Sequence, residues 1–106
     1  MPVLPLSPKG MVLTTRRMPS YSGLVDVYTP QNAPIGATMV GHIMVMKHTR
    51  EQLSSDIDAV LATAQALAAQ AGGNALVVNV GFSQGPLSPL SSAMLRGDVV
   101  KIRHGQ

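Results

Sequence analysis

The sequence predicts an α+β domain in which one long helix packs on a mostly antiparallel sheet of about four strands, in the order β-β-α-β-β. Residues 50–71 form a long alanine-rich segment with helical periodicity, and a pair of glycines at 72–73 ends it. The run at 75–82 that follows is typical of a buried strand. A chain of 106 residues fits one domain, so we expect a proline-rich arm at 1–10 and a single domain at 11–106.

The predicted helix begins near Arg50, where Thr49 and Gln52 match a capping box. Gly72 or Gly73 supplies the left-handed conformation that ends it. Apolar residues recur between these ends at spacings of three and four, so they form one stripe that faces the sheet. The stripe comprises Leu53, Ile57, Val60, Leu61, Ala64, Leu67, Ala68 and Ala71.

Segments rich in β-branched and aromatic residues predict the strands. They lie at 11–15 (a short edge strand), 23–29, 38–47, 75–82 and, after a loop at 83–92, at 93–103. We expect 75–82 at the centre of the sheet, because both of its faces are apolar. Lys101 and Arg103 suggest that the last strand is an edge protected by charge.

Composition excludes several classes of protein. Only 12% of the residues are charged, and the eight Lys and Arg are scattered among few aromatics, which argues against nucleic-acid binding. With no cysteine, the chain has no disulfide, thiolate metal site or cysteine nucleophile, and its redox compartment stays open. No apolar run at the N-terminus resembles a signal peptide, and acids and glutamines interrupt the helix, so we expect no membrane span.

Catalytic patterns are also missing from the sequence. Asp56 and Asp58 lie two residues apart on the predicted helix, so their side chains point about 200° apart and cannot share a substrate. We expect them to favour the helix dipole or to be solvated. The glycines at 72–73 follow a helix instead of opening one, the reverse of a phosphate-binding loop. The sequence therefore predicts neither an enzyme nor a bound cofactor.

One strand carries residues that suit a soft metal ion. His42, Met44, Met46 and His48 alternate along 38–47 and just beyond it, which puts them on one face at about 6.6 Å spacing. Imidazole and thioether are ligands for Cu(I), but four in a row need help from another strand or subunit to converge. Alternatively, the methionines fill the core and the histidines are partly solvated.

The helix surface opposite the apolar stripe predicts an interface. Small residues follow one another there, namely Ser55, Ala62, Ala66 and Ala69, and residues 59–71 carry no charge. With so little charge in the chain, we expect a homo-oligomer that uses this alanine face and the strand edges, with another protein as a further partner. An exposed alanine face is the alternative, because alanine is the best helix former.

Several short motifs in this chain resemble those of a known group. They are Val25-Asp26-Val27-Tyr28-Thr29, Gly36, Gly41, the helix leading into Gly73-Asn74-Ala75-Leu76-Val77-Val78, and Ala93-Met94-Leu95-Arg96-Gly97. Over about residues 11–103 the chain resembles the bacterial YbjQ/RcsF-like superfamily. Thr14-Thr15 followed by Pro19 and Tyr21 is similar to the YbjQ-like branch, which implies a compact α+β subunit of a pentameric ring, often described as a heavy-metal binder.

The Val-Asp-Val-Tyr-Thr strand looks more like RcsF, and this resemblance implies an outer-membrane lipoprotein that senses envelope stress through protein contacts. This chain lacks the cysteines of the sensor's disulfides and of its lipid attachment. The expected compartment is the cytoplasm if the chain is complete, and the periplasm if a signal or lipid-attachment segment has been removed. The sequence thus predicts a non-catalytic interaction and assembly module, with soft-metal binding as the alternative.

Overall fold

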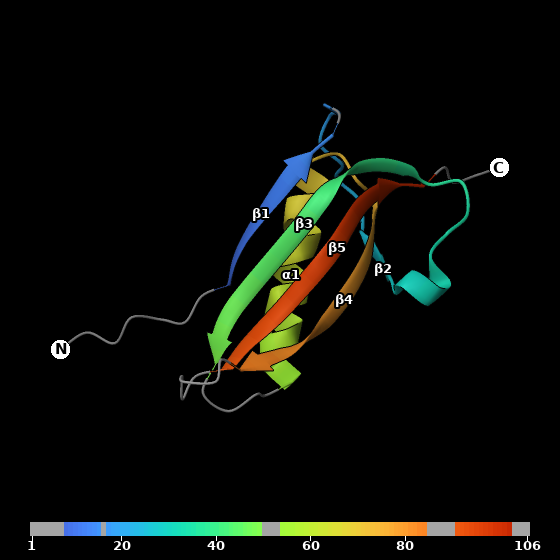
Figure 1. The fold of residues 1–106 in the computed structure, drawn as a ribbon. Coiled ribbons are helices and arrows are strands. Elements are labelled where there is room, and N and C mark those ends of the chain that lie inside the picture. The colour runs from blue at the N-terminus through green and yellow to red at the C-terminus, as the bar shows by residue number, and fades with distance from the viewer. Residues whose placement is uncertain (1–7, 16, 50–53, 85–90, 103–106) are drawn as a thin grey trace.

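A computed structural model describes residues 8–15, 17–49, 54–84 and 91–102, and there one α-helix lies on one face of a five-stranded sheet (Figure 1). The elements in chain order are β1 (Lys9–Thr14), β2 (Asp26–Tyr28), the short 3-10 helix η1 (Pro30–Asn32), β3 (Thr38–Thr49), α1 (Ser54–Gln70), β4 (Ala75–Gln84) and β5 (Ser91–Lys101). This arrangement confirms the predicted α+β class.

The strand order is β1-β3-β5-β4-β2, which makes β5 the central strand. The predictions that 75–82 is central and that 93–103 is an edge were therefore wrong. Ala93, Leu95 and Val99 of β5 are fully buried, and β5 pairs antiparallel with β3 on one side and with β4 on the other. Lys101, which suggested an edge, is the last residue of the strand, and its ammonium lies 4.8 Å from the centroid of the Tyr21 ring.

The sheet is mixed, because β2 pairs parallel with β4. This pairing covers only Asp26 to Tyr28, so β2 is shorter than the strand predicted at 23–29. Val25, just before it, is buried in the core, and its carbonyl accepts a hydrogen bond of 2.8 Å from the Gln65 side chain of α1. The chain is thus held against the helix before it reaches the sheet.

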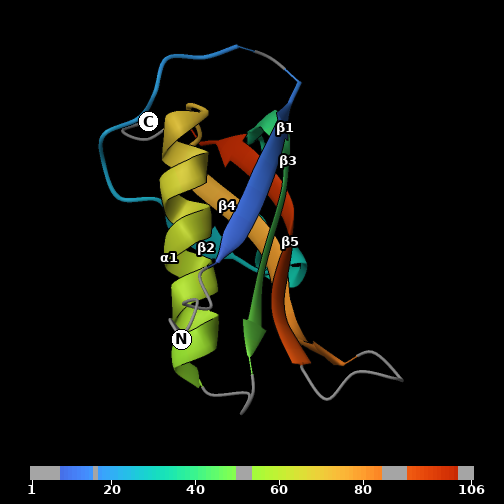
Figure 2. The ribbon, with the colours of Figure 1, turned by 90° about the vertical axis from the view of Figure 1, so that its left-hand side faces the viewer.

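The helix lies along one face of the sheet (Figure 2), and the predicted stripe packs against that face. Val60, Ala64 and Ala68 are fully buried. Half-buried members of the stripe pack around them, namely Ile57, Leu61, Leu67 and Ala71. Gly72 adopts φ +96°, and the Gly73 N–H donates to the carbonyl of Ala68 at 2.9 Å, so the predicted glycine end is confirmed. Leu53, the predicted helix start near Arg50, and the Thr49 side chain lie outside the described residues.

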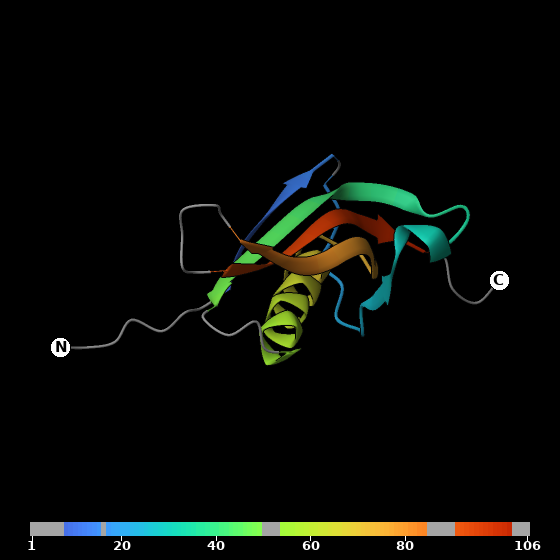
Figure 3. The same cartoon turned by 60° about the horizontal axis from the view of Figure 1, so that its bottom comes forward.

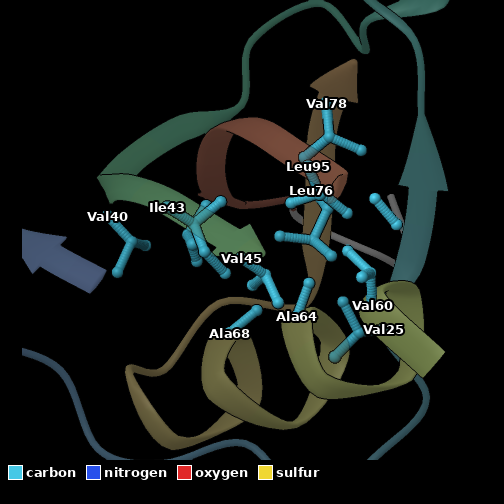
Figure 4. Close-up of a cluster of buried hydrophobic side chains, with 12 residues drawn as sticks. Val25, Val40, Ile43, Val45, Val60, Ala64, Ala68, Leu76, Val78 and Leu95 are labelled. Carbon is cyan, nitrogen blue, oxygen red and sulfur yellow. The ribbon is translucent and has the colours of Figure 1, made fainter. Parts of the chain in front are cut away.

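The core lies between α1 and the inner face of the sheet (Figure 4). Small alanines on the helix face larger aliphatic side chains of the strands, including Val45, Leu76 and Leu95, all of which are fully buried. This pairing of small with large side chains lets the helix lie close to the sheet without voids. The helix covers one side of the sheet only (Figure 3), which leaves the other side of β1, β3 and β5 as a surface.

Candidate functional site

The uncovered side of the sheet carries the residues predicted to bind metal. Along β3, Ile43 and Val45 are buried towards the helix, and the residues that alternate with them point the other way. All four predicted residues are exposed on that outer side: His42, Met44, Met46 and His48. Met44 and Met46 keep 39% and 37% of their surface exposed, so the alternative that they fill the core does not hold.

Neighbouring strands add apolar side chains that the sequence analysis did not connect with β3. Met11 of β1 is the register partner of Met44, and Met94 of β5 is the partner of Met46. Leu13, which is 65% exposed, lies opposite His42. We call this surface the methionine face, and it comprises Met11, Leu13, Met44, Met46 and Met94. No local signal in the sequence predicted this grouping, because residues 11–13 and 93–95 are short apolar runs without alternation and the register between distant strands was unknown.

Two shallow hollows shape the methionine face. One has a volume of about 310 Å³ and is lined by Met11, Leu13, His42, Ile43, Met44, Arg96 and Gly97. The other, of about 210 Å³, is lined by Lys9, Gly10, Met11, Met44 and Met46. Thioethers from two strands therefore share the smaller hollow, and side chains with this flexibility adapt to the shape of a partner.

The two histidines are held separately from the methionines and from each other. His42 Nδ1 lies 2.8 Å from Asp98 Oδ1, and His48 Nδ1 lies 3.2 Å from Ser92 Oγ, both across the β3–β5 pair. Six residues of extended strand put the histidines about 20 Å apart. One ion cannot bind both of them. Within the described residues, no group of three His, Cys, Asp or Glu side chains is placed to hold a metal ion.

The predicted alanine face is only partly free. Ser55, Ala62 and Ala66 are exposed, as an interface would require. Ala69 is half-buried against the core, and its carbonyl accepts a hydrogen bond of 2.7 Å from the Tyr21 N–H. The segment before β2 therefore runs along the C-terminal part of the helix and covers one end of this face.

A buried ion pair joins the start of α1 to β3. Lys47 points inward, and its Nζ donates to Oδ1 of Asp56, with side chains that are 18% and 8% exposed. Asp56 is therefore not solvated, but its place in the first turn of α1 agrees with the alternative that it favours the helix dipole, whereas Asp58 is exposed. The pair positions the helix on the sheet, and it lies on the opposite side of the sheet from the methionine face.

Comparison with known proteins identifies one fold relative. No family model and no curated protein matches the chain. A solved structure does match, the crystal structure of a Francisella virulence factor FvfA, with a TM-score of 0.69 and 25% sequence identity over 91% of this chain and 100% of that one. The two proteins share a fold, and the YbjQ/RcsF-like resemblance stays a prediction. No helix in the described part of the chain is long and apolar enough to cross a lipid bilayer.

Proposed function

We propose that this protein is a non-catalytic interaction and assembly module that self-associates and receives a partner protein on its methionine face. The observation that carries the proposal is the exposure of this face, with Met11 at 57%, Leu13 at 65% and Met44 at 39%. Antiparallel sheets with one free side usually place polar residues there. Burying a methionine or leucine side chain is worth about 1.5 to 3 kcal/mol, so a partner gains by covering such a surface.

Exposure also argues against catalysis by the pair of His42 and Asp98 on this side of the sheet. The side chains of His42 and Asp98 are 59% and 37% exposed. Catalytic pairs work in clefts that exclude water, because screening by solvent weakens their electrostatic effect. An exposed pair of this kind instead suits the polar rim of a binding surface.

The setting that we propose is bacterial envelope stress sensing through protein contacts. The RcsF-like strand around Asp26 supports this setting, and in the structure this strand is β2. The fold relative is named a Francisella virulence factor, which is compatible with a bacterial setting. Neither observation names a partner, so the proposal is tested on the surface itself.

The test of the proposal has two measurements. Sedimentation velocity at up to about 100 μM should show assembly of the wild type. The apolar dye 1-anilinonaphthalene-8-sulfonate should bind the native protein, and Met44→Glu with Met46→Glu should remove most of its fluorescence. Ala62→Glu with Ala66→Glu, which adds the same charge on the helix, is the matched control and should keep the fluorescence. A monomeric wild type, or dye binding that survives the methionine changes, would contradict the proposal.

A soft-metal-binding function is the second candidate, and the hollow shared by Met11, Met44 and Met46 favours it. Three thioethers can bind Cu(I), although Lys9 lines the same hollow and repels a cation. For this candidate we propose Met11 and the two β3 methionines as the ligands in place of the histidines.

Competition for Cu(I) with a chromophoric chelator tests this candidate. A physiological site should bind Cu(I) at sub-micromolar strength, and Met44→Leu with Met46→Leu should weaken it at least tenfold while keeping the surface apolar. Met39→Leu, which changes another exposed methionine of β3, is the control. The absence of Cu(I) binding, or binding that only His42→Ala with His48→Ala removes, would exclude the methionine hollow.

A further inference from the structure

The part of β4 beyond its pairing with β2 forms an edge of the sheet that has no strand partner among the described residues, although η1 also contacts β4. β2 pairs with β4 only over Ala75–Val77, while β4 continues to Gln84. On its other side, β4 pairs with β5 along its whole length. From Val78 onwards, β4 therefore has a strand partner on one side only among the described residues.

The backbone of this edge points its hydrogen-bonding groups outward at known residues. The Asp26 N–H donates to the carbonyl of Asn74 at 3.1 Å, so that carbonyl points towards β2. Successive residues of a strand direct their N–H and C=O groups to opposite sides. By this alternation Leu76 faces β2, and Val80 and Phe82 direct one donor and one acceptor each to the open edge.

The side chains of the same segment are apolar and exposed. Val80 and Phe82 are 37% and 38% exposed on the helix side of the sheet. A hollow of about 500 Å³ beside this segment is lined by Asn79, Val80, Gly81, Phe82, Met94 and Arg96. Residues 78–82 contain no charge and no proline, the two features that commonly protect an edge from pairing. The opposite edge of the sheet, β1, begins with Lys9.

We propose that two copies of the chain join edge to edge through residues 78–82 of β4, as an antiparallel pair related by a two-fold axis at Gly81. In this register Val80 lies opposite Phe82 of the second copy, so the outward donors and acceptors of both residues are satisfied. The facing side chains make β-branched and aromatic pairs, which favour antiparallel sheets. A side chain at Gly81 would meet nothing within 4 Å, so the axis falls at an open point of the edge.

Such a dimer would organise the binding surface. A two-fold axis normal to the sheet keeps both helices on one side and both methionine faces on the other. The hollow beside Met94 would then lie at the seam, and the two methionine faces would form one wider surface. The inference rests on the proposed self-association and specifies the contact that produces it.

Proline at position 80 tests the pairing directly. Val80→Pro removes one N–H, which points to the open edge and not to β5, and proline is tolerated on edge strands in this orientation. Each dimer would lose two hydrogen bonds, and we expect the dissociation constant to rise about tenfold to a hundredfold. Val80→Thr, which keeps the N–H and the branched side chain, is the matched control and should remain a dimer.

Sedimentation velocity, with circular dichroism to show that each variant is folded, separates the outcomes. A monomeric wild type at about 100 μM would overturn the proposed self-association together with this contact. If the wild type is a dimer and folded Val80→Pro is one too, the edge contact is wrong and self-association stands.

Amide hydrogen exchange on the wild type gives a reading that does not depend on a variant folding. The N–H groups of Val80 and Phe82 should be protected at about 100 μM and lose protection on dilution below the dissociation constant. Rapid exchange of both amides in a sample shown to be dimeric would exclude the β4 edge.

Discussion

Separating Lys47 from Asp56 should destabilise the fold far more than breaking a surface ion pair. Lys47→Met leaves the Asp56 carboxylate in a site that is 8% exposed without this cation. Removing one partner of a buried pair typically costs about 3 to 5 kcal/mol, and the 18% exposure of Lys47 lowers our expectation to about 3 kcal/mol. For a domain of this size, such a loss lowers Tm by about 12 to 24 °C.

The coupling between the two residues is measured with a double-mutant cycle. Asp56→Leu should cost less than Lys47→Met, because the long lysine stem can carry its ammonium to water. The double variant should recover most of the loss, which gives a coupling energy of about 2 kcal/mol. Urea unfolding followed by far-UV circular dichroism suits a chain without tryptophan. The protein concentration is held fixed because the proposed self-association would make the measured stability depend on it. A coupling below about 0.5 kcal/mol, as for exposed pairs, would refute the buried pairing.

Two further predictions test the sheet. Leu95→Ala, at a fully buried position of the central strand, should lower the free energy of unfolding in urea by about 2 to 5 kcal/mol. Leu13→Ala, at a position that is 65% exposed, should lower it by less than about 1 kcal/mol. Similar losses for the two variants would place β5 elsewhere in the sheet. A Cβ at Gly97 would clash with the carbonyl oxygen of Val77, so Gly97→Ala should lower Tm markedly. Gly81→Ala, whose Cβ meets nothing within 4 Å, should leave Tm unchanged or raise it, and equal effects would contradict the close β4–β5 approach at Gly97.

Local patterns were sufficient to predict the helix. The spacing of Val60, Ala64 and Ala68 and the glycine end at Gly72 depend on residues within one or two turns of each other. The fold class followed from this helix and the strand-like segments around it. The order of the strands in the sheet could not be predicted in this way, because it depends on pairings between residues far apart in the sequence.

The methionine face, too, was predictable only where it depends on neighbouring residues of one strand. Alternation along β3 placed Met44 and Met46 on one face, and the structure agrees. Met11 and Met94 join them only through the registers of β1 and β5, which no local pattern encodes. The predicted metal-binding role of His42 and His48 is weaker as a result, because these side chains contact Asp98 and Ser92 of β5.

A prediction and an alternative drawn from charged residues were wrong because the role of a charge depends on its position along the strand or helix and not only on its presence. Lys101 suggested an edge strand, but it ends β5 on the helix side, over the Tyr21 ring, beyond the part of the strand that is buried. Asp56 suggested a solvated helix start, but an inward-facing lysine nine residues earlier in the chain makes burial tolerable. A charge protects an edge only when it lies along it. β4 carries no charge between Val78 and Phe82, and Val80 and Phe82 offer exposed apolar side chains there, which is why we expect a second copy at this edge.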